Sequence, residues 1–139
     1  MTESAPAAYS AYADGASRGN PGPSAIGVVV FDVSGRQVHT VSRRLGAGTN
    51  NEAEYKAAIA ALEAALGLGA SQIDVYMDSE LVVRQLTGRY RVRNPRLMPL
   101  HGRLLDLRGR FERVTFRQVP RAQNRIADGL ANKALDQTP

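Results

Sequence analysis

The most constraining feature of this sequence is a long helical pattern that stands directly before a segment typical of a β-strand. Over residues 51–68 apolar side chains recur every three to four positions, as on one face of an α-helix, and Gly69 can end that helix in a left-handed conformation. The next segment, Gln72–Met77, alternates apolar and polar residues as a strand does. With a strand before it, such a helix predicts a crossover connection in an α/β sheet.

The rest of the chain supplies the other strands and helices of the predicted sheet. Residues 9–13, 25–31 and 37–45 read as three strands, and turns at 15–24 and 32–36 join them into an antiparallel meander. The later elements are a short helix over Glu80–Leu86, an amphipathic helix that Asn94 would cap ahead of Pro95, a strand over 114–119 and a last helix over 124–135. We therefore expect an α/β fold with a five-stranded mixed sheet of strand order 3-2-1-4-5, flanked by helices on both faces.

A chain of 139 residues has the size of one domain, which we assign to residues 9–135, with flexible tails at 1–8 and 136–139. The hydrophobic fraction of 43% and the charged fraction of 22% are typical of a soluble globular protein. Cys is absent, so any metal site must use oxygen ligands. The first residues do not resemble a secretory signal and nothing demands a dimer, so we expect a cytoplasmic monomer.

Charge is distributed unevenly along the chain. Thirteen of the 18 basic residues lie from Arg84 onward, where only four of the 13 acidic residues are found. This asymmetry favours a polyanionic partner such as nucleic acid, because Arg makes bidentate contacts with phosphate groups. The same residues could equally be the solvated faces of helices, and charge alone does not name the partner.

Two acidic residues mark the place where the predicted sheet should carry its site. Asp14 ends the first strand and Asp78 ends the fourth. These strands are expected to lie side by side and parallel at the point where the strand order reverses, and open α/β sheets bind ligands at the carboxyl ends of such strands. The two carboxylates should therefore meet although they are distant in the chain.

Helical phase adds a third carboxylate. Glu54 lies on the same stripe as the small apolar residues of the 51–68 helix, whereas Glu52 and Glu63 point roughly the opposite way. Acidic side chains rarely face a sheet without a reason, although an acid in the first turn also suits the helix dipole. Asp128, near the start of the last helix and beside its apolar face, is open to the same two interpretations.

A cluster of carboxylates in a partly desolvated pocket would repel one another unless a cation joined them. With oxygen ligands only, Mg²⁺ is the expected cation and Mn²⁺ a possible substitute. Two such ions could activate a water molecule and stabilise the leaving oxygen in the hydrolysis of a phosphodiester. This chemistry agrees with the basic second half of the chain.

The chain resembles the type 1 ribonuclease H family over roughly residues 9–135, in particular the bacterial and archaeal members without a basic handle. Four motifs carry the resemblance, in family order and spacing: YADGASRGNPGP, TNNEAEY, MDSELVVRQL and PRAQNRIADGLANKA. The resemblance implies a Mg²⁺-dependent endonuclease that cleaves the RNA strand of an RNA/DNA hybrid and leaves 5′-phosphate and 3′-hydroxyl ends. It also implies that Asp14, Glu54, Asp78 and Asp128 hold two metal ions, with Asp14 and Asp78 as the central ligands.

The same resemblance assigns residues to the substrate. Those expected to line the minor groove and read the 2′-hydroxyl groups are Gly15, Ala16, Ser17, Arg18, Asn20, Asn50 and Asn51. Thr49 matches a position that holds a phosphate of the DNA strand. Helix capping is the alternative for Asn50 and Asn51, and we expect one of them to cap the helix while the other contacts substrate.

Two departures from the family pattern bear on turnover and binding. Gln118 stands where many members carry a loop histidine that is thought to assist product release. The basic handle that some members insert after the short helix is missing, and Arg89, Arg91 and Arg93 would partly replace it by contacting phosphates. In addition, Glu80 stands where some relatives carry a base-contacting Gln, so that contact is not expected here.

Two other functions remain open at this level. A weakly catalytic module that binds hybrid or double-stranded RNA is favoured by Gln118 and the missing handle, and disfavoured by the complete set of four acids. A DNA nuclease of the same superfold is the other alternative, and the asparagine-rich motif TNNEAEY points away from it.

Overall fold

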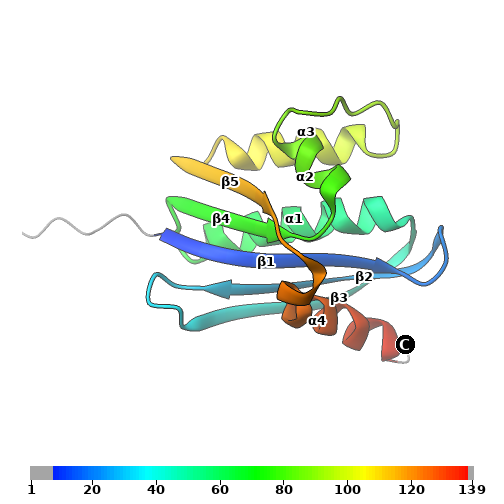
Figure 1. Ribbon diagram of the computed structural model, residues 1–139, viewed down its shortest axis with the longest axis horizontal. Helices are drawn as coiled ribbons and strands as arrows, with labels where there is room; N and C mark the ends of the chain where they lie inside the picture. The colour runs from blue at the N-terminus through cyan, green and yellow to red at the C-terminus, as the bar shows by residue number, and fades with distance from the viewer. Residues whose placement is uncertain (1–7, 138–139) are drawn as a thin grey trace, which may run out of the picture.

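The computed structural model describes residues 8–137, which form one sheet with helices on both faces (Figure 1). The strands are β1 (Ala8–Ser17), β2 (Gly22–Phe31), β3 (Gln37–Gly48), β4 (Gln72–Met77) and β5 (Arg113–Gln118). The helices are α1 (Asn50–Gly67), α2 (Glu80–Leu86), α3 (Met98–Arg108) and α4 (Arg125–Asp136), with a 3₁₀ turn, η1 (Arg121–Gln123), before the last. Of the predicted tails, residues 1–7 and 138–139 lie outside the described part of the chain.

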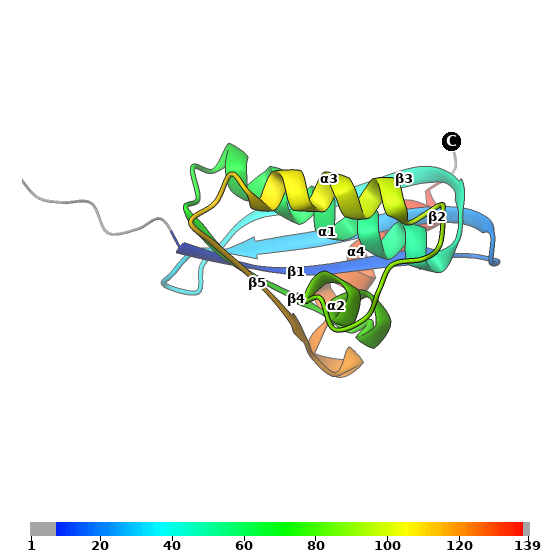
Figure 2. The same ribbon diagram turned by 90° about the horizontal axis from the view of Figure 1, so that it is seen from above.

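The sheet has the order β3-β2-β1-β4-β5, which confirms the predicted topology. β1 pairs antiparallel with β2 and parallel with β4, so the strand order reverses at the β1–β4 contact. Helices α1 and α3 cover one face and α4 lies on the other (Figures 1 and 2). Within residues 8–137, no helix combines the length and apolar character needed to span a membrane.

The meander is longer than the sequence predicts at the end where the acids lie. β1 continues to Ser17 and β2 begins at Gly22, so most of the glycine-rich segment predicted as a turn belongs to the sheet. The pairing Ser17↔Ser24 and a hydrogen bond of 2.8 Å from the Arg18 amide to the Pro23 carbonyl close the hairpin tightly. Backbone pairing thus outweighs the turn preference of Gly and Ser residues in this segment.

One predicted helix start and one predicted helix cap are wrong. Asn94 caps only a turn, in which its Oδ1 atom accepts a hydrogen bond of 2.8 Å from the Arg96 backbone amide. Helix α3 begins four residues after Asn94 and has Pro99 in its first turn. The cap of α1 is Thr49 rather than either Asn. Its hydroxyl accepts from the Glu52 amide at 3.2 Å, and the Glu52 carboxylate accepts from the Thr49 amide at 3.0 Å, which forms a capping box. Gly69 has φ +80° and ends α1 as predicted.

Candidate active site

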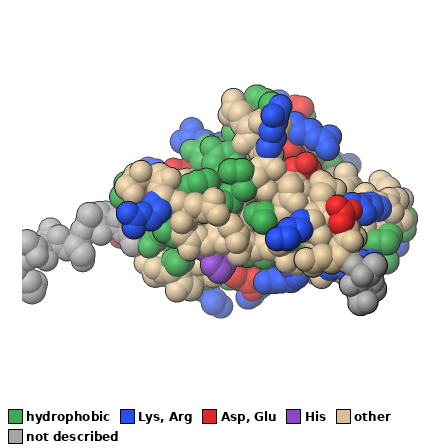
Figure 3. Space-filling model, turned by 90° about the horizontal axis from the view of Figure 1, so that it is seen from below, with side chains coloured by type: hydrophobic (Ala, Val, Ile, Leu, Met, Phe, Trp, Pro, Cys, Tyr) green, Lys and Arg blue, Asp and Glu red, His purple; other side chains and the backbone are tan. Residues whose placement is uncertain are grey.

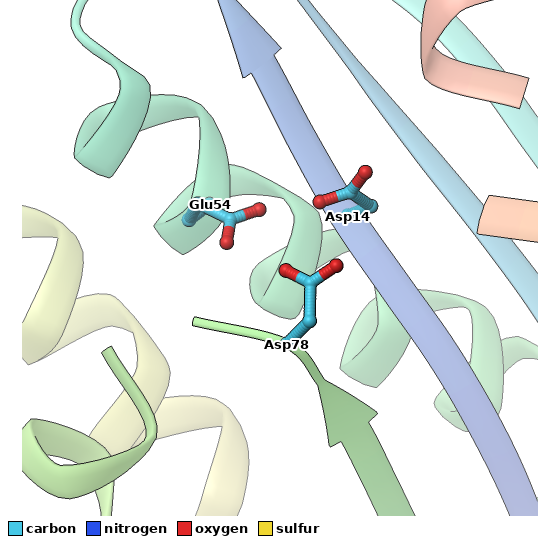
Figure 4. A group of neighbouring side chains, drawn as sticks. All are labelled: Asp14, Glu54 and Asp78. Carbon is cyan, nitrogen blue, oxygen red and sulfur yellow. The ribbon is translucent and has the colours of Figure 1, made fainter. Parts of the chain in front are cut away.

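Asp14 and Asp78 meet at the point where β1 and β4 separate. The parallel pairing of these strands ends at Tyr12↔Tyr76, two residues before each acid. Figure 4 shows the carboxylates of Asp14, Glu54 and Asp78 directed toward one another from β1, α1 and the end of β4. One oxygen from each of the three can be chosen so that all lie within 4.8 Å of one another. The juxtaposition predicted from topology is therefore present.

Glu54 reaches this point because α1 lies directly against the backbone of β1. A Cβ atom on Gly15 would lie 2.2 Å from the carbonyl carbon of Ala53, so only glycine permits this approach. The Gly15 amide donates a hydrogen bond to a carboxylate oxygen of Glu54. The side chain of Glu54 is 5% exposed, whereas Glu52 belongs to the capping box. Glu54 rather than Glu52 therefore faces the sheet, as helical phase predicts.

Asp128 enters the same pocket from the other side of the sheet. Gly27 pairs with Asp14 in the β1–β2 ladder, and a Cβ atom on Gly27 would lie 2.0 Å from the Ala127 carbonyl oxygen. This contact seats α4 against β2. Asp128 accepts a hydrogen bond of 3.2 Å from Asn132 Nδ2 and lies 3.9 Å from Arg121 Nη2. It lines the pocket but stands outside the tight group of three carboxylates.

The pocket strongly disfavours unneutralised charge. Burial, together with the neighbouring charge of Glu54, raises the pKa of Asp14 to about 10, and Asp14 is only 6% exposed. Burial also raises the pKa of Glu54 to about 7, although the Gly15 amide partly opposes the shift by stabilising the carboxylate. A divalent cation would relieve the same repulsion that protons relieve here. The oxygen-only donor set fits Mg²⁺ or Mn²⁺.

The predicted substrate residues divide into two groups. The acidic pocket, about 290 Å³ in volume, is lined by Asp14, Gly15, Ala16, Ser17, Arg18, Asn50, Glu54, Asp78, Arg121, Asp128, Asn132 and Leu135. Asn20 lies beside Asn50, whose amide donates to Asn20 Oδ1 at 3.0 Å. The predicted contacts from Gly15 to Arg18 and at Asn50 thus adjoin the acids.

The second group lies apart from the acids. Arg91 lines another pocket, between α2, α3 and the loop that joins them, and Arg89 and Arg93 are exposed on the same loop. Gln118 ends β5 with an exposed side chain. On the face that carries α4, Lys and Arg side chains are scattered among other residues and do not form one patch (Figure 3).

Sequence reasoning missed two polar side chains of the acidic pocket. Arg121 lies on η1 and Asn132 lies one helical turn after Asp128, and both line the pocket. Asn132 could have been found, because a residue four positions after Asp128 shares its face of the helix. Arg121 could not, because nothing in its spacing distinguishes it from the other arginines of the basic half.

Comparison with known proteins agrees with this geometry. A family model described as reverse transcriptase-like matches residues 12–134. Ribonuclease HI of Halobacterium salinarum is 48% identical over 126 residues, and the match covers 91% of this chain and 63% of that protein. The crystal structure of RNase H1 from that archaeon superimposes with a TM-score of 0.92 at 46% identity, over 94% of this chain and 99% of that one. This chain belongs to the type 1 ribonuclease H family.

Two further proteins are similar over nearly the whole described domain. A bifunctional protein of Mycobacterium tuberculosis is 46% identical over 125 residues, which are 89% of this chain but only 34% of that protein. An RNase H1 solved in complex with an RNA/DNA hybrid has a TM-score of 0.88 at 41% identity, over 92% of this chain and 96% of that one. The chain thus spans about a third of the mycobacterial relative and about two thirds of the halobacterial one.

Proposed function

We propose that this protein is an endonuclease that hydrolyses the RNA strand of RNA/DNA hybrids with Mg²⁺ as its metal, leaving 5′-phosphate and 3′-hydroxyl ends. The observation that carries the proposal is the convergence of Asp14, Glu54 and Asp78 within 4.8 Å in a pocket that Asp128 also lines. Membership of the type 1 ribonuclease H family and the similar protein solved with a hybrid support the choice of substrate.

Each acid has a role that its position suggests. Asp14, on β1 just beyond its pairing with β4, and Asp78, directly after β4, would be the central ligands, with Glu54 and Asp128 completing the set from α1 and α4. Two bound divalent ions would supply the activation of a water molecule and the stabilisation of the leaving oxygen. The close backbone contacts at Gly15 and Gly27 hold Glu54 and Asp128 beside Asp14, so little reorganisation of these three carboxylates would be needed when substrate binds.

The residues beside the acids suit recognition of RNA. The Asn50 backbone amide donates to the Oδ1 atom of Asn20 and leaves the Nδ2 group of that side chain available. This NH₂ group could donate a hydrogen bond to a 2′-hydroxyl oxygen. The Thr49 hydroxyl accepts a bond in the capping box and retains its own proton to donate to a phosphate. Exposed Arg89, Arg91 and Arg93 would contact the nucleic acid further from the acids.

One gel tests the proposal. Labelled hybrid, duplex RNA, duplex DNA and single strands are incubated with Mg²⁺ or Mn²⁺ and with wild type, Asp14→Asn or Asp78→Asn. We expect wild type alone to cleave, and to cleave the RNA strand of the hybrid. Retained cleavage in either variant would contradict the site, equal cleavage of duplex DNA would contradict the substrate, and hybrid binding without cleavage would indicate a binding module. Cytoplasmic location and the monomeric state stay predictions from the sequence.

A further inference from the structure

Asn124 is a buried polar residue whose role the four carboxylates do not explain. It lies between η1 and α4 and is 1% exposed. Its Nδ2 atom donates a hydrogen bond of 3.0 Å to the Ala13 carbonyl oxygen on β1. Its Oδ1 atom is buried and has no hydrogen-bond partner among the described residues.

This bond joins β1, which carries Asp14, to the start of α4, which carries Asp128. Ala13 lies directly before Asp14 and is the first β1 residue beyond the β1–β4 pairing, which ends at Tyr12↔Tyr76. At its other end, the Asn124 carbonyl accepts a bond of 3.0 Å from the Asp128 amide. One residue therefore links the backbone beside Asp14 to the backbone of Asp128.

Stabilisation explains only one of the two polar atoms of the Asn124 side chain. The bond to Ala13 satisfies a buried carbonyl, whereas the buried Oδ1 atom without a donor is unfavourable. Gly27 is in close contact with α4 over residues 127–131, so the middle of the helix is anchored to the sheet without Asn124. The bond to Ala13 anchors the start of the helix, whose first turn carries Asp128, and so bears on the direction in which Asp128 points.

We propose that Asn124 is a positioning residue that sets the placement of Asp128 relative to Asp14, and through it the affinity of this pocket for divalent cations. The inference rests on the proposed function, because it presupposes that these carboxylates bind metal. Outer residues that orient metal ligands typically contribute about 10- to 100-fold to metal affinity. Asn124 would act in this way through the backbone, without contacting the ion.

The test measures metal binding through thermal unfolding of the full chain. Asn124→Leu keeps most of the side-chain volume and removes both polar atoms, and Asn124→Ala serves as a second variant. Tyr55→Phe is the control, because it removes another buried bond, of 2.5 Å to Gln85 Oε1, without touching α4. Melting temperatures are recorded in EDTA and along Mg²⁺ and Mn²⁺ titrations, and cleavage of hybrid is followed along the same titrations.

For Asn124→Leu we expect a lower melting temperature in EDTA, because the buried Ala13 carbonyl loses its donor, together with a metal midpoint raised about tenfold or more. Cleavage should recover at correspondingly higher Mg²⁺. Tyr55→Phe should lower the melting temperature and leave the metal midpoint unchanged. A wild-type midpoint in Asn124→Leu, and in Asn124→Ala if the first variant does not fold, overturns the positioning role alone. Absence of any metal response in wild type overturns the proposed function as well.

Discussion

The acidic pocket and the loop that carries Arg89, Arg91 and Arg93 are built in opposite ways. In the pocket, buried carboxylates are held by direct backbone contact of two helices with the sheet. On the loop, called here the arginine strip, the three side chains are exposed and the segment forms neither helix nor strand. Fixed groups can act on the rate of a reaction, whereas exposed long side chains act on binding through charge. The two regions should therefore respond differently to substitution.

The largest effect is expected for Asp14→Asn. Loss of a central ligand should lower cleavage of hybrid by on the order of 10³-fold, since metal ions contribute several kcal/mol to such transition states. The same substitution should raise the melting temperature in EDTA, because it removes a buried acid whose charge the pocket disfavours. Single-turnover cleavage and thermal melts measure the two effects. An active variant, or one destabilised in EDTA, would contradict the description of the pocket.

Replacing the arginine strip by alanine should mainly weaken binding. We expect the triple variant to raise the KM for hybrid by about tenfold and to reduce the salt slope of binding by about two to three, because each arginine that contacts a phosphate adds about one to that slope. The rate at saturating substrate should stay close to that of wild type. Arg103→Ala, which removes one exposed arginine that pairs with Glu63, is the control. An effect of the control one third as large as that of the triple variant would indicate that only overall charge matters, because the triple variant removes three charges and the control removes one.

Arg121 combines features of the two regions, because it is exposed and positively charged like the arginine strip and yet lines the acidic pocket. Arg121→Ala should lower kcat by about fivefold, the size expected for one partly screened contact of a cation with a phosphate. Arg125→Ala removes an exposed arginine of α4 that does not line this pocket and should leave kcat unchanged. Steady-state kinetics separates kcat from KM. A change confined to KM would place Arg121 with the arginine strip instead.

The smallest effect is a pH dependence of stability in EDTA. Between about pH 4 and pH 7 the folded protein retains protons on Asp14 and Glu54 that the unfolded chain has released, because burial raises both pKa values. The free energy of unfolding should therefore fall as pH rises through this window, and further toward pH 10 for Asp14. We expect the melting temperature to drop by about 5 °C more in wild type than in Asp14→Asn. Parallel curves for the two proteins would contradict the raised pKa of Asp14.

The sequence predicted the parts of the site that follow from element order and periodicity. The order of strands and helices made Asp14 and Asp78 neighbours, and helical phase selected Glu54. Family resemblance added Asp128, which the structure brings to the same pocket. The first two depend on a short list of allowed topologies and on a regular repeat, whereas Asp128 depends on the resemblance alone.

What the sequence could not predict depends on contacts between distant segments. Asn124 and Ala13 are 111 residues apart, and no local sequence pattern predicts the hydrogen bond between them. The cap of α1 was misplaced because Thr49 and two asparagines in succession are all good caps. The start of α3 was misplaced because Pro95 and Pro99 both suit a first turn. Local preferences leave such choices open, and tertiary packing decides between them.

Gly15 and Gly27 also have a consequence for how this pocket can change over evolution. Because both helices touch bare backbone near Asp14, the distance of each helix from its strand is set by backbone contact, without a side chain between them. Substitution of either glycine cannot adjust that distance by small steps, since even an added methyl group would force a whole helix outward. We expect the catalytic dimensions to be inherited unchanged, while diversification is confined to the loops and helix faces around them.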